Sequence, residues 1–409
     1  MLPEGWHRST LGEIARITSG GTPDRSEPTY WGGSVPWVTT GEIQFNTITD
    51  SDEKITEAGL RNSSAKLFPP GTLLMAMYGQ GKTRGQVAKL AIEAATNQNS
   101  AAILLTEGHD PDFYFHFLAW QYDEIRDFGH SGGVSHLNAG LLKQIPVPVA
   151  PLDEQQRIAL ILSTWDQAIV VYERLLKTSL RQKRSLMATL LSGQRRIAGH
   201  HDRWTYVDFD EVFERVTRKN AVGNTNVLTI SGEHGLISQR DYFSKDIASA
   251  NLSGYSLLHR GEFAYNKSYS AGYPMGAIKA LDKYDAGVVS SLYLCFRMRE
   301  EFRGSHDFFR HYFEAGLFDQ EIEGIAQEGA RNHGLLNVSV TDFFKLRLQI
   351  PTSAEQRRIA EVINSAEADE RCLSSQLQAL RDEKQSLMQQ LLTGRRRVLQ
   401  AGSDVESFA

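Results

Sequence analysis

The chain contains a long internal repeat, and this repeat limits what it can fold into. Residues 154–197 and 355–398 align without a gap at an offset of 201, with 15 identities in 44 positions. Solenoid repeats recur every 20 to 50 residues or so, which makes a period near 200 typical of a duplicated domain. Weaker matches extend the repeat towards the N-terminus, among them Trp6 with Trp204 and Leu137-Asn138 with Leu336-Asn337.

The repeat predicts four segments in the order globular, helical, globular, helical. We place the globular segments at 1–150 and 201–350, and the helical segments at 151–200 and 351–409, the last including a C-terminal tail. In the globular segments, short apolar runs such as 100–105, 226–231 and 261–266 predict strands. Amphipathic stretches at 112–128 and 307–326 predict helices. Each globular segment is therefore expected to be a small α+β domain.

The two repeated segments read as long helices with a coiled-coil seam. Apolar residues alternate in steps of three and four, as heptad a and d positions do. Pro151 and Pro351 precede the helices, and Gly193 and Gly394 fit their ends. The frame predicts seam positions at Ile158, Leu162, Trp165, Ile169, Tyr172, Leu176, Lys183, Ile359, Ile363, Glu370, Leu373, Leu377 and Leu380.

Charged residues interrupt this seam and test its register. An antiparallel pair with its pseudo-two-fold centre near Leu176 and Leu377 brings Lys183 level with Glu370, which would fix register and orientation. The alternative is that both side chains extend to solvent. Lys384 faces Ile169 in this register, so it is expected to reach solvent. At the helix starts, Asp153 with Gln156 and Ser353 with Gln356 predict capping boxes.

Composition excludes several classes of protein. No run of 18 apolar residues is present, so no membrane span or membrane partner is expected. Two cysteines, Cys295 and Cys372, provide neither a disulfide framework nor a zinc site, and this usage suits the cytoplasm. The 12 histidines are scattered, and no catalytic or metal-binding constellation is recognisable. The chain is thus expected to be non-catalytic.

One short stretch does resemble a catalytic motif. Residues 76–85, AMYGQGKTRG, fit a loose phosphate-loop pattern, but the following VAKLAI reads as a strand, whereas a phosphate loop must run into a helix. The equivalent place in the second half, NKSYSAGYPMG, lacks Gly-Lys-Thr. We interpret both as polar loops between strands, with a solvated hairpin loop as the alternative. Their candidate DNA-contacting side chains are Gln80, Lys82, Thr83 and Arg84 in the first loop, and Asn266, Lys267 and Tyr269 in the second.

A second paired region precedes each helix. It is glycine-rich at 129–138 and 329–337, where backbone can approach a partner closely. Its candidate donors are His136, Arg331, Asn332 and His333. The alternative is a connector in which asparagine caps the next turn.

The layout resembles the specificity subunit of Type I restriction–modification enzymes. The resemblance rests on helices that begin PLDEQQRIA or SAEQRRIA and end LLSGQRR or LLTGRRR, and on the opening LPEGWHRSTLGEIARITSGGTP. It implies that 1–150 and 201–350 are target recognition domains, each reading half of a split site in double-stranded DNA. Two long helices would separate them, pair antiparallel and dock two methyltransferase subunits.

The resemblance also implies where the chemistry resides. Restriction subunits with translocase activity would join the complex, and S-adenosylmethionine, ATP and magnesium would bind partners rather than this chain. Two alternatives remain open: a helical scaffold unrelated to DNA, and an orphan specificity protein without an active enzyme. Residues 1–150 carry 11 basic and 16 acidic side chains, and 201–350 carry 17 and 20. Phosphate neutralisation dominates DNA affinity, so the isolated chain is expected to bind DNA poorly.

Overall fold

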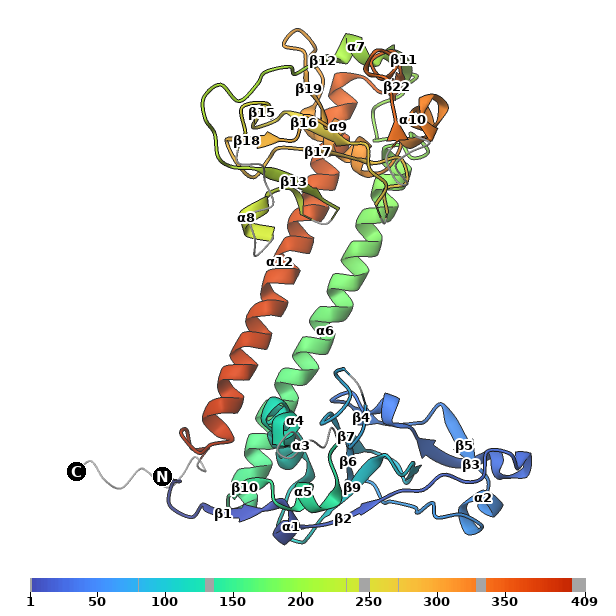
Figure 1. Cartoon of the computed structure of the whole chain (residues 1–409), viewed down its shortest axis with the longest axis vertical. Coiled ribbons are helices and arrows are strands. Elements are labelled where there is room, and N and C mark those ends of the chain that lie inside the picture. Colours follow the sequence, from blue (N-terminus) through green and yellow to red (C-terminus); the bar gives the residue numbers. More distant parts are fainter. Residues whose placement is uncertain are drawn as a thin grey trace, which may run out of the picture. The chain divides into compact units, whose positions relative to one another are not determined.

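A computed structural model describes residues 2–79, 81–128, 136–232, 234–242, 251–270, 272–328 and 336–398. The chain divides into two compact units. Unit 1 comprises Met1–Arg174 with Ser375–Ala409, and unit 2 comprises Leu175–Ser374. Two helices of 39 residues, α6 (Leu152–Leu190) and α12 (Ser353–Leu391), each contribute one half to each unit (Figure 1).

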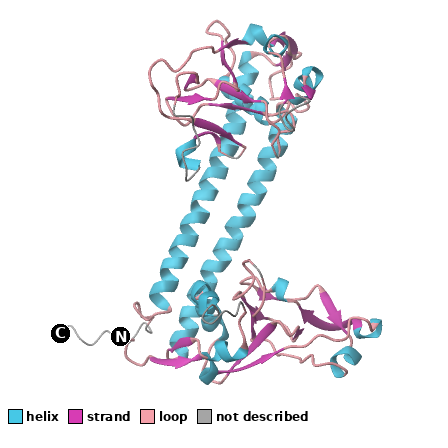
Figure 2. Ribbon diagram, in the orientation of Figure 1, coloured by secondary structure: helices cyan, strands magenta, loops and turns pink. Residues whose placement is uncertain are grey.

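Unit 1 has a five-stranded sheet in the order β2-β9-β6-β7-β4, a three-stranded sheet β5-β3-β8, and the antiparallel pair β1–β10. Figure 2 distinguishes the strands, in magenta, from the helices, in cyan. Its strands are β1 (His7–Thr10), β2 (Ala15–Ser19), β3 (Trp31–Val38), β4 (Thr47–Ile48), β5 (Glu53–Ile55), β6 (Leu73–Ala76), β7 (Val87–Leu90), β8 (Ala95–Thr96), β9 (Ser100–Leu105) and β10 (Pro146–Val149). Its shorter α-helices are α1 (Leu11–Ile14), α2 (Glu57–Arg61), α3 (Pro111–Trp120), α4 (Tyr122–Phe128) and α5 (Ala139–Lys143).

Unit 2 repeats this plan with a four-stranded sheet, β12-β19-β16-β17, and the pair β11–β22; its other strand pairs are β13–β14, β15–β18 and β20–β21. Its strands are β11 (Thr205–Asp208), β12 (Phe213–Arg215), β13 (Leu228–Ser231), β14 (Gly235–Ser238), β15 (Ser256–His259), β16 (Phe263–Asn266), β17 (Ala277–Ala280), β18 (Ala286–Val289), β19 (Leu294–Met298), β20 (Gln327–Glu328), β21 (Leu336–Asn337) and β22 (Arg347–Ile350). Its shorter α-helices are α7 (Phe209–Val212), α8 (Gln239–Tyr242), α9 (His306–Glu314), α10 (Asp319–Ile325) and α11 (Val340–Phe343).

These elements confirm the α+β prediction for both globular segments. The predicted strand runs contain β9, β13 and β16, and each predicted helical stretch forms two helices, α3 with α4 and α9 with α10.

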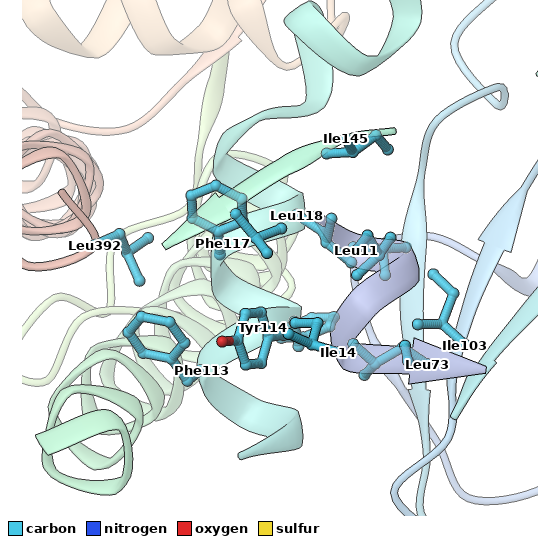
Figure 3. Packing of buried hydrophobic residues seen from close by; sticks show 14 of the residues in the cluster. Leu11, Ile14, Leu73, Ile103, Phe113, Tyr114, Phe117, Leu118, Ile145 and Leu392 are labelled. Atoms are coloured by element: carbon cyan, nitrogen blue, oxygen red, sulfur yellow. The ribbon is translucent and has the colours of Figure 1, made fainter. Parts of the chain in front are cut away.

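The end of α12 belongs to the core of unit 1: Leu392, just past the helix, points towards Phe113 of α3, and Leu11 and Ile14 lie on the other side of α3 (Figure 3). Within the described residues, no helix is both long and apolar enough to cross a bilayer.

The first turn of each long helix is tied to the N-terminus of a shorter one. Gln155 accepts a hydrogen bond from the backbone N–H of Asp110 and donates to the carbonyl of Ala150. Gln356 repeats this arrangement with Ser305 and Pro351. The helices begin at Leu152 and Ser353, so Asp153 and Ser353 lie within the first turn and not at the N-cap position. The predicted capping boxes are therefore wrong.

Every predicted seam residue is buried or half-buried. In unit 1, α12 residues 381 and 384 pair with α6 residues 173 and 166, so the helices run antiparallel. Lys183 and Glu370 form an ion pair in unit 2, as the register requires. Lys384 does not reach solvent as expected: it pairs with Asp166, which lies next to the seam residue Trp165 and outside the a and d positions.

A buried histidine recurs beneath the long helices. His116 of α3 is 2% exposed and lies 3.2 Å from Ser163 Oγ and 3.7 Å from Asp166 Oδ2 of α6. His311 of α9 lies 2.7 Å from Asn364 Oδ1 of α12, at the position equivalent to Ser163. Burial, followed by the charges of Lys384 and Lys89, lowers the pKa of His116 to about 3.

We predict that His116→Gln flattens the pH dependence of stability. Below about pH 6.5 the unfolded chain protonates His116 and the folded chain does not. The contribution of neutral His116 to the free energy of unfolding is therefore complete above that pH and is lost as pH falls towards 3. Between about pH 7.5 and about pH 5 the wild type should lose about 2 kcal/mol more than the variant. Urea unfolding at both values measures this. The exposed His7→Gln serves as the control and should follow the wild type; a His116→Gln curve parallel to the wild type would contradict the prediction.

A double-mutant cycle of Lys183→Met and Glu370→Leu should give a coupling free energy of about 1 kcal/mol in unfolding experiments. The two side chains are only 19% and 25% exposed, so solvent screens their attraction less than at the surface. The matched control is Arg381 with Glu173, a pair with 48% and 46% exposure, which should couple by a few tenths of a kcal/mol at roughly the limit of detection. Equal coupling in both cycles would show that the seam pair does not set the register.

Candidate nucleic-acid interface

In both units, a polar loop connects two adjacent strands of the main sheet. Loop 1 (residues 77–86) joins β6 to β7, and loop 2 (residues 267–276) joins β16 to β17. Each loop has a glycine at or next to its last residue, Gly85 in loop 1 and Gly276 in loop 2, and their φ values of 86° and 78° suit glycine. Because the Gly-Lys-Thr triplet leads into strand β7 rather than a helix, the structure contradicts a phosphate loop here.

The described end of the second predicted region, residues 136–138 in one half and 336–337 in the other, lies against the loop of its half. The backbone N–H of Leu137 donates to Met77 O at 3.0 Å, and that of Leu336 donates to Lys267 O at 2.9 Å. These contacts are equivalent in the two units, and they join residues 60 apart in sequence in unit 1 and 69 apart in unit 2. Asn138 also caps α5 by accepting from Leu141 N, as the connector alternative proposed.

Loop 1 is held in place by helix α4. Arg126 donates to the carbonyl of Gly81 at 2.6 Å, and the Tyr122 hydroxyl donates to the carbonyl of Lys82. Arg126 also donates to the Tyr122 hydroxyl at 2.9 Å, so the two anchors support each other. Since these anchors bind only backbone, the Lys82 side chain remains exposed at the tip of a fixed loop.

The remaining loop 1 candidates differ in accessibility. Thr83 is half-buried. Arg84 is only 6% exposed, and its guanidinium donates to Arg126 O at 3.5 Å. Arg84 therefore supports the loop from within, and the structure argues against it as a surface contact.

Sequence reasoning missed Tyr78. Its ring stacks on that of His136 with centroids 4.9 Å apart and an interplanar angle of 9°, and it is 42% exposed. The stack is thus a partly exposed aromatic group on the same loop as Lys82. Tyr78 lies within residues 76–85, but its side chain is aromatic, whereas the side chains expected to contact DNA there are cationic, amide or aliphatic hydroxyl groups.

In loop 2, the candidates divide between support and exposure. Lys267 donates to Val338 O at 3.2 Å, and burial, with Arg215 nearby, lowers its pKa. Asn266 accepts a hydrogen bond from Ser268 N. Tyr269 is 64% exposed and is the side chain of this set that is open to a ligand. Gln80, Arg331, Asn332 and His333 lie outside the described residues.

The structure thus contains two α+β domains that share a duplicated plan, together with two paired long helices. Among the described residues, no cluster of metal-binding side chains is found. Comparison with known proteins shows which family the chain resembles. Residues 3–178 match the family described as the Type I restriction modification DNA specificity domain.

Curated relatives agree with this match. The chain is 28% identical over 173 residues to the MjaIX specificity subunit of Methanocaldococcus jannaschii, covering 41% of this chain and 39% of the relative. It is 29% identical over 163 residues to the EcoR124I/EcoR124II specificity subunit of Escherichia coli, covering 38% and 40%. The matched segment thus spans about two fifths of the length of these relatives.

A solved structure extends the likeness to the rest of the fold. The S subunit of a Type I restriction–modification system from M. genitalium superposes with a TM-score of 0.57 at 13% identity, covering 96% of both chains. Residues 3–178 are therefore similar to a Type I DNA specificity domain, and the chain has the fold of this S subunit.

Replacing Lys82 with Ala should weaken DNA binding by the assembled complex similarly for all sequences. A lost phosphate contact reduces the slope of log affinity against log salt by about 1, whereas a lost base contact relaxes one position at a cost of about 1–3 kcal/mol. Titrations at several salt concentrations distinguish the two. Arg61→Ala, an exposed cation at the end of α2, is the charge-matched control. Equal behaviour of both variants and the wild type would remove Lys82 from the interface.

Proposed function

We propose that this chain is the DNA sequence-recognition subunit of a Type I restriction–modification complex. Residues 1–150 and 201–350 are its two target recognition domains, each reading one half of a bipartite site. The supporting observation is that, in both units, the polar loop is joined to the second predicted region. Equivalent backbone hydrogen bonds at Leu137 and Leu336 make this connection. Two similar but non-identical surfaces suit a ligand with two different half-sites.

The long helices are the proposed docking surface for two methyltransferase subunits. Helix α6 exposes apolar side chains that its seam does not use, including Leu160 at 69%, Val171 at 51% and Leu175 at 47%. Exposed apolar residues spaced along one helix favour contact with partner helices. Restriction subunits with translocase activity complete the complex, and S-adenosylmethionine, ATP and magnesium bind these partners.

The charge of the two globular domains supports the proposal that this chain reads the DNA sequence while partner subunits hold the DNA. Both proposed DNA-reading segments are net acidic, with 11 basic against 16 acidic side chains in 1–150. A protein gains DNA affinity mainly by neutralising phosphates, so these domains discriminate sequences through local contacts while partners supply much of the clamp.

Replacing residues 1–150 with the matching domain of a relative should change one half of the methylated site and leave the other unchanged. Each reader has its own hydrophobic core and its own loop, so the second half-site should not respond to the swap. The measurement is genome-wide mapping of methylated adenines in the host carrying the wild-type or the swapped gene.

Deleting the gene is the control for the role itself, and it should abolish methylation at the whole site. A methylation pattern that survives the deletion would favour the scaffold or orphan alternatives. A swap that changes both half-sites would show that the two domains do not read independently.

A further inference from the structure

A cavity of about 1060 Å³ opens in unit 2 between α6, α12, α9 and β17. Its lining is partly apolar, with Leu180, Met187 and Ile278 among the contributors, and partly cationic. This combination is typical of sites that hold an organic anion, where apolar contacts supply affinity and a few charges supply orientation.

Half of the lining Lys and Arg residues are neutralised by the protein itself. Lys183 pairs with Glu370, Lys279 with Glu314, and Arg310 with Glu367, the last at 3.0 Å. Arg310 Nε also lies 3.8 Å from Asp282, the third acidic residue of the lining. These pairs stabilise the walls of the cavity.

Arg184 of α6, Arg371 of α12 and Lys283 after β17 remain. In the described part of the chain none of the three forms an ion pair or a side-chain hydrogen bond, although all line the cavity and are exposed. Lys283 lies over the ring of Tyr284 at 5.6 Å. Three positive charges around one cavity repel one another and favour an anion with more than one negative charge.

The internal repeat shows that the fold does not require these charges. At the offset of 201, the positions of Arg184 and Arg371 are occupied in unit 1 by Gln385 and Val170. By contrast, Lys183 and Met187 of the cavity wall recur as Lys384 and Met388. These two wall residues are kept in both units, whereas Arg184 and Arg371 are found in unit 2 alone.

We infer that this cavity binds a phosphate-bearing ligand whose phosphates lie between Arg184 and Arg371, while the rest of the ligand packs on the apolar wall. Guanidinium groups bind phosphate oxygens through paired, charge-assisted hydrogen bonds, and two of them match a group with several charges. The phosphates belong either to a free nucleotide or to a nucleic-acid backbone; in the second case the inference rests on the proposed function.

The test replaces both arginines by the residues that unit 1 carries at the equivalent places, Arg184→Gln with Arg371→Val. The full-length wild type should bind ATP or inorganic tripolyphosphate in calorimetry, with an affinity that falls as salt rises. The double variant should bind at least about tenfold more weakly, because two charge-assisted contacts are lost. Arg181→Gln, an exposed arginine of α6 that is absent from the cavity lining, should bind within about twofold of the wild type.

A second arm distinguishes the two sources of phosphate. If neither small probe binds, the same variants are assembled with the partner subunits and titrated with duplex DNA. Weaker binding by the double variant and not by Arg181→Gln then assigns the site to backbone phosphate. If the double variant equals the wild type in both arms while its thermal midpoint is unchanged, the inference is overturned. Methylation mapping is independent of these titrations, so failure here leaves the proposed function untouched.

Discussion

The architecture depends on two buried ion pairs that join the start of one long helix to the chain just past the end of the other. Glu154, 2% exposed in the first turn of α6, receives two hydrogen bonds from Arg397, at 2.8 and 2.9 Å. Glu355, 1% exposed in the first turn of α12, receives two from Arg196, both at 2.7 Å. Burial opposes the charge of Glu154, but hydrogen bonds from Arg397, Trp6 and Val398 outweigh it and lower its pKa. A carboxylate at a helix N-terminus is also stabilised by the helix dipole, and breaking such a buried pair costs about 3–5 kcal/mol.

Because the two units are copies of one plan, comparing them separates residues that the fold needs from residues that it does not need. The two Glu–Arg pairs, the paired glutamines and the buried histidines recur in both units, so we assign them to the fold. The surroundings of the pairs have diverged: Trp6 donates its indole N–H to Glu154 at 2.9 Å, whereas the indole N–H of Trp204 finds no partner among the described residues. Among the described residues, the Tyr78–His136 stack is found in unit 1 and the unpaired Arg184 and Arg371 in unit 2. Since the shared fold does not need these features, they are better candidates for function.

The parts of the fold that depend on local periodicity could be predicted from the sequence. The offset of 201, the seam and strands such as β9 and β16 follow from hydrophobic spacing, which burial enforces directly. The errors have a common cause, since they concern polar side chains whose partners are distant in sequence. Heptad spacing places Lys384 opposite seam residues, but its carboxylate partner, Asp166, lies outside the a and d positions of α6. Arg84 reads as a surface cation, yet the packing of α4 against loop 1 buries it. Within the candidate site, the sequence identified both loops and the segments that join them, but it could not show which side chains support the loop backbone and which remain exposed.

A rigid support under a sparse set of exposed groups has a consequence for recognition. Arg126 and Tyr122 fix the backbone of loop 1, so little conformational entropy is lost when Lys82 or the Tyr78–His136 stack meets a ligand. An acidic domain gains little from long-range attraction to DNA, so its contribution must come from contacts that fit in one geometry and fail in others. Discrimination between sequences is a difference of affinities, and a weak, preorganised reader provides that difference without binding tightly to every sequence. Under the proposed function, partner subunits supply the affinity, and the two units can differ in their loops while they keep the same long helices.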